Sequence, residues 1–328
     1  MELVCPAGNL AALRAAVDAG ADTVYVGFRD ETNARNFPGL NFSPDEMREG
    51  IGYAHARSRK VYVAINTFPR AGDVGPWRRA VDDAAQLGAD AVILADIGLI
   101  EYAKRRHPQL RRHLSVQAGA SNRDAIEFFR DAFGVSRVVL PRVLTVAEIA
   151  ALNASLGVET EVFAFGGMCP MAEGRCSLSS YVTGQSPNMS GVCSPASHVR
   201  YEQRGDDLVS RLGTFTINRF PGREPAGYPT LCKGRFVAHE RTMYLFEEPT
   251  SLSVAHMLGD LAAAGVSALK IEGRQRGRAY VAEVVARFRR LVDAVSVAHA
   301  APGRDVEALR RLAEGGRDTA GAYQRGWR

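Results

Sequence analysis

Several common features are missing from this 328-residue sequence, and each absence excludes a class of protein. No apolar run reaches the ~18 residues that a membrane-spanning helix needs. The first residues carry no basic segment and no cleavage site of the kind found in signal peptides, so we expect a cytoplasmic protein. Charged residues make up 23% and hydrophobic residues 46% of the chain, which is the balance of a globular protein and excludes a disordered one.

Lysine is scarce. The 41 basic residues include only four lysines, Lys60, Lys104, Lys233 and Lys270, and the arginines are spread along the chain. With a net charge of +5 and an isoelectric point near 9.0, this pattern is typical of an ordinary solvated surface. An RNA-binding face is the alternative, because clustered arginines can contact phosphates.

Three short motifs are also absent. No G-x-G-x-x-G follows the first expected strand, which argues against a dinucleotide-binding sheet. No H-E-x-x-H is present, and none of the seven histidines is placed to activate a nucleophile, so we do not expect peptidase activity. Cys5 ends the first strand and could face a barrel mouth, but we favour a buried hydrophobic role for it.

One pattern recurs five times: an apolar helix end, a glycine, and then a β-branched run. Gly20 precedes 23–26 in this way, and the same pattern precedes strands expected near 91, 137, 160 and 268. Three further strands bring the total to eight, starting near residues 3, 23, 61, 91, 114, 137, 160 and 268. Seven helices separate them and 280–297 supplies the eighth, so the sequence predicts an α/β fold of the TIM-type (β/α)8 barrel class, with a doubly wound open sheet as the alternative.

The spacing of the last two strands predicts an insertion. About 85 residues are added after the seventh strand, on the side of the barrel where active sites lie. We therefore expect a barrel formed by 1–165 and 250–300, a β-rich insertion at 166–249 with strands near 212–217 and 235–239, and a C-terminal surface extension at 301–328.

Four of the five cysteines fall in the insertion: Cys169, Cys176, Cys193 and Cys232. Clustering of this kind in a reducing compartment indicates a metal site. The spacing C-x6-C-x16-C-x38-C lacks the C-x2-C pair of zinc knuckles and suits an iron–sulfur cluster, which accepts thiolates from separated loops. Zinc and ordinary buried thiols remain alternatives.

Polar residues follow several strands where a barrel would have its catalytic face. They are Asn66, Asp96, Gln117 and Arg142, with Arg35 in the loop after the second strand and Lys270, Glu272 and Arg274 along the eighth. The last three share one face because side chains alternate along a strand. Such a column predicts either recognition of an anionic substrate or a structural ion-pair network.

The cysteines lie within long motifs. Residues 166–181 read GGMCPMAEGRCSLSSY and 191–195 read GVCSP, and both resemble the hallmark of the collagenase-like peptidase family. Three further stretches, GYPTLCKGR at 227–235, EEPTSL at 247–252 and KIEGRQR at 270–276, are similar to the branch of that family that supports ubiquinone biosynthesis without oxygen. The similarity covers nearly the whole chain.

This resemblance implies a [4Fe-4S] cluster held by Cys169, Cys176, Cys193 and Cys232. It also implies a heterodimer with a sister protein of the same family, a lipid-binding accessory protein, and ring hydroxylation of the ubiquinone precursor with prephenate as the oxygen donor. Other branches hydroxylate a pyrimidine in ribosomal or transfer RNA. Two alternatives therefore stay open: RNA hydroxylation by the same chemistry, and a structural partner of a catalytic sister subunit.

Overall fold

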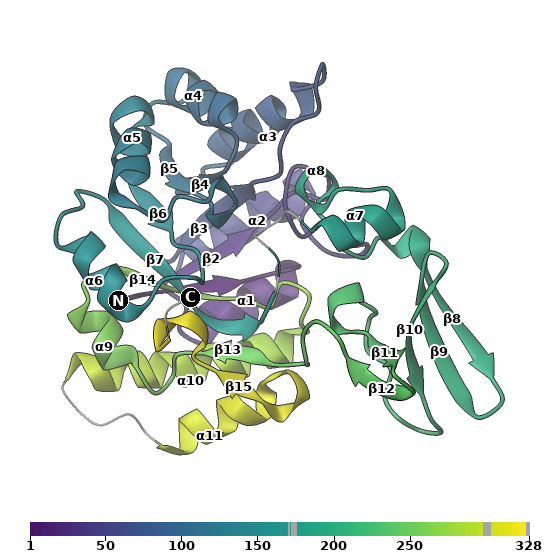
Figure 1. Cartoon of the computed structure of the whole chain (residues 1–328). Coiled ribbons are helices and arrows are strands. Elements are labelled where there is room, and N and C mark those ends of the chain that lie inside the picture. The colour runs from purple at the N-terminus through teal and green to yellow at the C-terminus, as the bar shows by residue number, and fades with distance from the viewer. Residues whose placement is uncertain (170, 172–175, 298–302, 326–328) are drawn as a thin grey trace.

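The computed structural model describes residues 1–169, 171, 176–297 and 303–325, and its main body is a closed barrel (Figure 1). Eight parallel strands form it: β1 (Glu2–Pro6), β2 (Thr23–Val26), β3 (Lys60–Ile65), β4 (Ala91–Leu94), β5 (Arg111–Leu114), β6 (Arg137–Val139), β7 (Glu159–Gly167) and β14 (Ala268–Ile271). Each strand pairs with the next, and β14 pairs with both β1 and β7. This closure confirms the predicted TIM-type barrel and excludes the open sheet.

A helix follows each barrel strand and covers the outside of the sheet. These helices are α1 (Leu10–Asp18), α2 (Pro44–His55), α3 (Gly75–Gln86), α4 (Ile97–Arg106), α5 (Arg123–Phe133), α6 (Val146–Asn153), α9 (Leu258–Ala263) and α10 (Arg278–Ser296). Capping boxes define two of the starts: Ser43 and Glu46 at α2, and Thr145 and Glu148 at α6. In the described part of the chain, no helix combines the length and apolar character that a membrane crossing requires.

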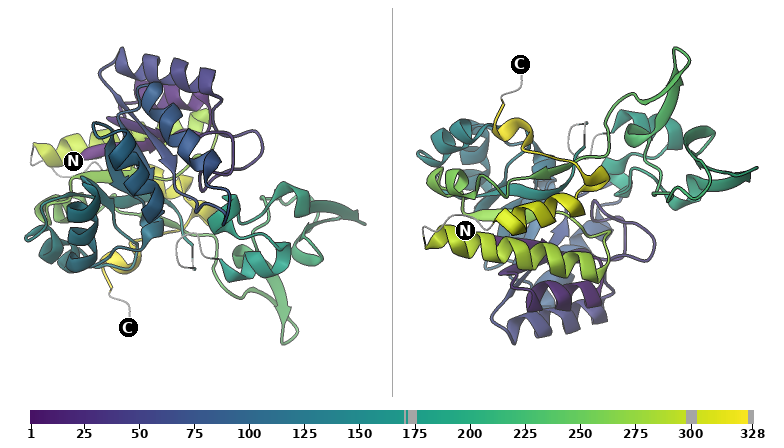
Figure 2. Two further views of the ribbon diagram at one scale, coloured as in Figure 1. Left: turned by 90° about the horizontal axis from the view of Figure 1, so that it is seen from above. Right: turned by 90° about the horizontal axis from the view of Figure 1, so that it is seen from below.

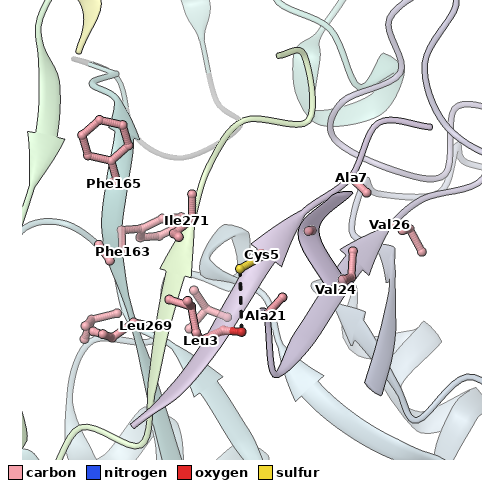
Figure 3. Close-up of a cluster of buried hydrophobic side chains, with 14 of the residues drawn as sticks. Leu3, Cys5, Ala7, Ala21, Val24, Val26, Phe163, Phe165, Leu269 and Ile271 are labelled. Carbon is pink, nitrogen blue, oxygen red and sulfur yellow. Dashed lines mark hydrogen bonds between the residues drawn. The ribbon is translucent and has the colours of Figure 1, made fainter. Parts of the chain in front are cut away.

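Strand β1 shows how the sequence fills two layers. Leu3 and Cys5 point outward into the core between sheet and helices (Figure 3). Val4 belongs instead to the cluster inside the barrel, with Tyr25 and Tyr62. Cys5 is fully buried, and its thiol donates to the carbonyl oxygen of Leu3 at 3.8 Å. It therefore does not face the barrel mouth, as expected for a small buried hydrophobic residue.

The barrel interior is charged near the amino ends of its strands. Arg137 is almost fully buried and pairs with Glu2 at 2.6 Å, Glu159 at 2.7 Å and Glu161 at 3.3 Å. Three carboxylates thus compensate the charge of the buried guanidinium group. Removal of either the arginine or its carboxylates would leave buried charge with less compensation. His113 lies nearby, edge-on to a tyrosine ring, and burial lowers its pKa well below the ordinary value.

The insertion leaves the barrel after β7 and projects to one side of it (Figures 1 and 2). It begins with α7 (Ser177–Thr183) and α8 (Pro187–Ser190), continues through the antiparallel sheet β8 (Val199–Arg204), β9 (Asp207–Leu212) and β10 (Phe215–Phe220), and ends with the hairpin β11 (Arg235–Ala238) and β12 (Arg241–Tyr244). The β-rich character matches the prediction. The strand expected at 212–217 is confirmed only for 215–217, which lies in β10, because a turn separates it from Leu212 at the end of β9. The strand expected at 235–239 corresponds to β11.

The C-terminal tail packs more closely than a surface extension would. Helix α11 (Gly303–Leu312) lies beside α10, and β15 (Asp318–Thr319) pairs with β13 (Ser251–Ser253), which itself pairs with the end of β7. Tyr323 is buried and donates to the carbonyl oxygen of Phe163 at 3.0 Å. The tail is therefore part of the barrel edge.

Candidate functional site

A pocket opens at the carboxyl ends of the barrel strands. It is a cavity of about 80 Å³, and its polar lining consists of Tyr25, Arg35, Asn66, Ser115, Gln117, Lys270, Glu272 and Arg274. Residues from β2, β3, β5 and β14, or from the loops that follow them, thus converge at one point. This is the face of a (β/α)8 barrel that carries active sites.

Lys270 forms part of the pocket wall, and two residues of other barrel strands hold its side chain in place. Its Nζ atom lies 2.7 Å from Oε1 of the fully buried Glu161 and 4.0 Å from the centre of the Tyr25 ring. The ion pair joins the pocket to the charged barrel interior, because Glu161 also pairs with Arg137. Glu161 and Tyr25 thus fix the position of the ammonium group.

Glu272 is the carboxylate of the pocket. It forms ion pairs with Arg142 and, at 3.4 Å, with Arg35. Burial alone would raise the pKa of Glu272, but the charges of the two guanidinium groups outweigh it and lower the pKa below the ordinary value. Glu272 is therefore ionised near neutral pH and draws two arginines from different loops to the same place.

Arg274 is the cation whose charge is least compensated. It is buried, and its Nη1 atom donates to Oδ1 of Asn33 at 3.1 Å. Burial lowers its pKa to about 10, so it still carries a proton at neutral pH. Within the described ranges, no carboxylate lies within ion-pair distance of this side chain. A buried cation of this kind favours binding of an anionic group in the pocket.

The structure therefore assembles most of the polar residues singled out in the sequence. Arg35, Asn66, Gln117, Lys270, Glu272 and Arg274 line the pocket, and Arg142 contacts it through Glu272. Asp96 does not line it: its side chain accepts from the backbone N–H of Leu99 and caps α4. Gln117 lies in a short 3-10 helix after β5 and not within a strand, because β5 begins and ends three residues earlier than expected.

The pocket carries an excess of positive charge. Among the described residues that line it, Arg35, Lys270 and Arg274 are cationic and Glu272 is anionic. The side-chain amide of Asn66 accepts from the backbone N–H of Ala34 at 3.0 Å and donates to Ser115 at 3.2 Å, which fixes the loop that carries Arg35. This arrangement suits a small ligand with one or more carboxylates.

The four insertion cysteines come from three separate segments near this pocket. Burial, together with the neighbouring Cys169 and Cys193, raises the pKa of the Cys232 thiol to about 11. Burial likewise raises the pKa of Cys193, where Arg35 acts in the opposite direction and Cys176 in the same direction. Each of the four thiols therefore interacts electrostatically with at least one other, and Cys193 also interacts with the pocket residue Arg35.

An all-thiol donor set of this kind fits an iron–sulfur cluster in its chemistry. The described residues contain no group of three or more Cys, His, Asp or Glu side chains close enough together to hold a metal ion. Part of the first cysteine motif, at 170 and 172–175, lies outside the described residues. The cluster thus remains a prediction of the residue types.

Close contacts attach the insertion to the barrel mouth. The backbone N–H of Phe68, after β3, donates to the carbonyl oxygen of Asn188 in α8 at 3.0 Å. Gly191 has a φ of 80°, and a Cβ atom there would lie 2.3 Å from the carbonyl oxygen of Asn33. Asn33 is also the partner of Arg274, so the segment that leads to Cys193 packs directly on the pocket wall.

Sequence reasoning missed Tyr25 and Glu161 as site residues. Both lie inside strands, and Tyr25 looks like an ordinary core residue in the run TVYV. A signal was present for Glu161, since a carboxylate within the apolar strand β7 requires a buried cation, and Lys270 is the cation in the apolar strand β14.

Comparisons with known proteins find relatives that match most of this chain. The tRNA hydroxylation protein P of Escherichia coli (strain K12) is 31% identical, and the match covers 96% of this chain and 73% of that protein. The tRNA hydroxylation protein P1 of Bacillus subtilis (strain 168) is 31% identical over 89% of this chain and 63% of its own. The 23S rRNA 5-hydroxycytidine C2501 synthase of Escherichia coli (strain K12) is 29% identical over 93% of this chain and 42% of its own.

These relatives are longer than the present chain and are all named for hydroxylation of RNA. A family model for peptidase family U32 matches residues 8–323, which include the barrel strands from β2 onward, the insertion and most of the tail. The chain therefore belongs to peptidase family U32.

Proposed function

We propose that the chain is a subunit of an oxygen-independent hydroxylase that holds a [4Fe-4S] cluster on Cys169, Cys176, Cys193 and Cys232. The observation that carries the proposal is the placement of the cysteine-bearing insertion against a buried cationic pocket, with Cys193 within electrostatic range of Arg35. The names of the family relatives support hydroxylation as the type of reaction. When bound, such a cluster would supply one-electron chemistry beside the pocket.

The pocket residues take the role of binding and orienting the oxygen donor. Arg274 is buried and protonated, and Lys270 is held in place by Glu161. Both cationic groups are therefore already ordered before a ligand binds. A dicarboxylate such as prephenate matches this pair of cations, because the planar guanidinium group binds a carboxylate through two parallel hydrogen bonds. Closure of the site by the insertion would exclude water from the donor.

The ring that accepts the hydroxyl group is proposed to be that of the ubiquinone precursor. The support is the motif set GYPTLCKGR, EEPTSL and KIEGRQR, which resembles UbiU, the oxygen-independent ubiquinone hydroxylation protein. The last of these motifs contributes three of the pocket residues, Lys270, Glu272 and Arg274. The resemblance also implies a UbiV-like sister subunit and a UbiT-like lipid-binding accessory protein as partners.

A second candidate acceptor is a pyrimidine base in RNA. The observation in its favour is that the relatives described above act on tRNA or 23S rRNA by name. The chemistry at the pocket would be the same in both cases. The difference lies in the surface around it, since an RNA substrate needs phosphate contacts and its binding weakens steeply with salt.

A heterodimer is part of the proposal, and the insertion is the surface we propose for it. Large apolar side chains are exposed there: Tyr181, Tyr201, Phe215, Tyr228, Val237, Met243, Leu245 and Phe246. Tyrosine, phenylalanine and methionine, which make up most of this set, are enriched at protein interfaces. The third possibility is a purely structural role beside a catalytic sister subunit. Activity of the complex with the pocket arginines of this chain replaced would distinguish it.

The test is anaerobic purification with and without the sister protein, followed by assays on two acceptors. One assay uses a ubiquinone precursor, the other uses unmodified tRNA and rRNA, and each is run with and without prephenate. Prephenate-dependent ring hydroxylation of the quinone precursor supports the proposal. Hydroxylated RNA alone would assign the chain to the second candidate, and full activity with the pocket arginines replaced would leave only the structural role.

A further inference from the structure

The C-terminal tail places one carboxylate between two segments of the candidate site. Glu314 follows α11, and its Oε2 atom pairs with Nζ of Lys233, the residue directly after Cys232. Its Oε1 atom pairs with Nη2 of Arg276 at 2.9 Å, in the loop between β14 and α10. A single side chain therefore ties the tail to the Cys232 turn and to the barrel.

The same carboxylate lies against the strand that leads to Cys169. A Cβ atom at Gly167 would lie 2.8 Å from Oε1 of Glu314, so a side chain at this position would displace the carboxylate. The backbone N–H of Glu314 donates to the buried hydroxyl of Ser251 at 2.9 Å, and Ser251 pairs with Gly167 between β13 and β7. Both the position and the orientation of the glutamate are thus fixed.

This ion pair differs from an ordinary surface pair of the tail. The side chains of Lys233 and Glu314 are 17% and 24% exposed, whereas those of Arg311 and Glu307, one helical turn apart in α11, are 75% and 52% exposed. Exposed pairs within one helix contribute little. A half-buried pair that joins segments far apart in sequence limits how those segments can move relative to each other.

We propose that Glu314 is a positioning residue that holds the Cys232 turn against the Cys169 segment at the barrel mouth. The tail is then part of the site, although none of its described residues lines the barrel-mouth pocket. The inference rests on the proposed function only in treating the two cysteines as ligands. We call the ion pairs of Glu314 with Lys233 and Arg276 the Glu314 clamp. Its effect on the Cys232 turn can be tested without any metal.

The experiment measures alkylation of each cysteine by iodoacetamide in metal-free, reduced protein, read out residue by residue by mass spectrometry. Glu314→Gln keeps the shape of the side chain and removes its charge, and we expect it to speed the labelling of Cys232 by about fivefold or more. Lys233→Gln should do the same, and the double variant should add little, because both remove one interaction. Lys233→Arg keeps the charge and should restore slow labelling.

Two internal controls make the result specific. Glu307→Gln removes the exposed tail pair and should leave all rates unchanged. Cys5 is buried in the barrel core and should stay slow in every variant. Labelling of Cys232 at the wild-type rate in Glu314→Gln would overturn the inference, and so would equal acceleration of Cys5, which indicates general loosening of the fold.

A second measurement separates this inference from the proposed function. After anaerobic reconstitution with iron and sulfide, Glu314→Gln should lose iron to a chelator several times faster than the wild type and Glu307→Gln. If the wild type takes up no iron at all while Cys232 is still released by Glu314→Gln, the clamp stands and the cluster is refuted. If iron is held equally well by both, the clamp does not position the ligands.

Discussion

Arg142 and Glu272 form a half-buried ion pair in which the guanidinium group also lies over the ring of Phe163, 3.5 Å from its centre. The arginine is thus oriented by a charge on one side and an aromatic face on the other. It follows β6, the glutamate follows β14, and the phenylalanine lies in β7. The pair therefore joins three neighbouring strands at the barrel mouth.

The first prediction concerns this pair. Arg142→Ala leaves Glu272 with Arg35 as its cationic partner and removes a charge-assisted contact at the pocket edge. Such a contact in a closed site is worth roughly 2–4 kcal/mol, so the hydroxylation rate should fall ~30- to 1000-fold while iron content and melting temperature stay near wild type. Arg142→Lys should restore little, because an ammonium group cannot reproduce the planar fork.

The control for this experiment is Arg105→Ala, which removes an exposed pair with Glu101 in α4. It should leave activity, iron and stability unchanged. Full product yield in Arg142→Ala would remove this residue from the site. A drop in melting temperature and iron that runs parallel to activity would make the pair structural.

The second prediction concerns Arg274. If it binds a carboxylate of the donor, Arg274→Ala should raise the donor concentration needed for half-maximal rate by ~30-fold or more and leave the cluster intact. Arg274→Lys loses the planar geometry and the contact with Asn33, so we expect a loss nearly as large. The measurement is the dependence of the rate on prephenate concentration. An unchanged dependence in both variants would argue against donor binding at this residue.

The third prediction concerns the metal. Protein purified without oxygen should contain about four irons and four sulfides per chain. Replacing any one of Cys169, Cys176, Cys193 or Cys232 by alanine should lose most of this iron, whereas Cys5→Ala should retain it, since Cys5 lies in the core between sheet and helices. Stoichiometric zinc in place of iron, in wild-type protein handled without oxygen, would refute the cluster.

The fourth prediction concerns acid stability. Burial alone would raise the pKa of Glu2, but its hydrogen bond and charge interaction with Arg137 outweigh this and lower it to about 2 from 4.5. Because the folded-state pKa lies below the unfolded value, this stabilisation is fully present above about pH 4.5 and is lost as the pH falls toward 2. A shift of this size corresponds to roughly 3 kcal/mol.

Urea unfolding at a series of pH values from 7 to 3 measures this effect. Glu2→Gln should lower the free energy of unfolding at pH 7 and flatten its fall below pH 5, whereas Glu307→Gln should follow the wild-type curve. Arg137→Met should be far more damaging, by roughly 3–5 kcal/mol, because it removes the ion-pair partner of Glu2 and one of the two cations beside the fully buried Glu161. A wild-type pH profile in Glu2→Gln would show that the pair does not contribute.

The barrel could be predicted from sequence because its signals are local. A glycine that ends a helix, followed by a β-branched run, marks most of the strands, and the parity of Lys270, Glu272 and Arg274 correctly places all three at one pocket. Strand β5 begins earlier than expected because Arg111 and Arg112 hide the strand pattern. Arg111 pairs with Glu159 of β7, and Arg112 donates to the carbonyl oxygen of Phe133 at the end of α5. Charge in a strand is explained only by partners elsewhere in the chain.

The remaining features depend on partners distant in sequence. The glycine- and arginine-rich sequence of the tail predicts a surface extension, and β15, with only two residues, leaves no strand pattern that would contradict it. Its contacts come from Glu314, Tyr323 and the pairing with β13, none of which leaves a local pattern. The contact of the segment before Cys193 with the barrel mouth likewise follows from how the insertion folds, which the cysteine spacing alone does not determine.

Closure of the barrel also has a consequence for synthesis of the chain on the ribosome. Glu2 in the first strand pairs with Ala268 in the last strand, β14, and β7 also pairs with β14. Neither β1 nor β7 can complete its pairing before β14 is synthesised. The two open edges thus stay unpaired while the whole insertion is translated, and exposed strand edges invite association with other chains. Slowed translation or a chaperone bound over this interval should therefore affect the yield of soluble protein more than any change in the finished barrel.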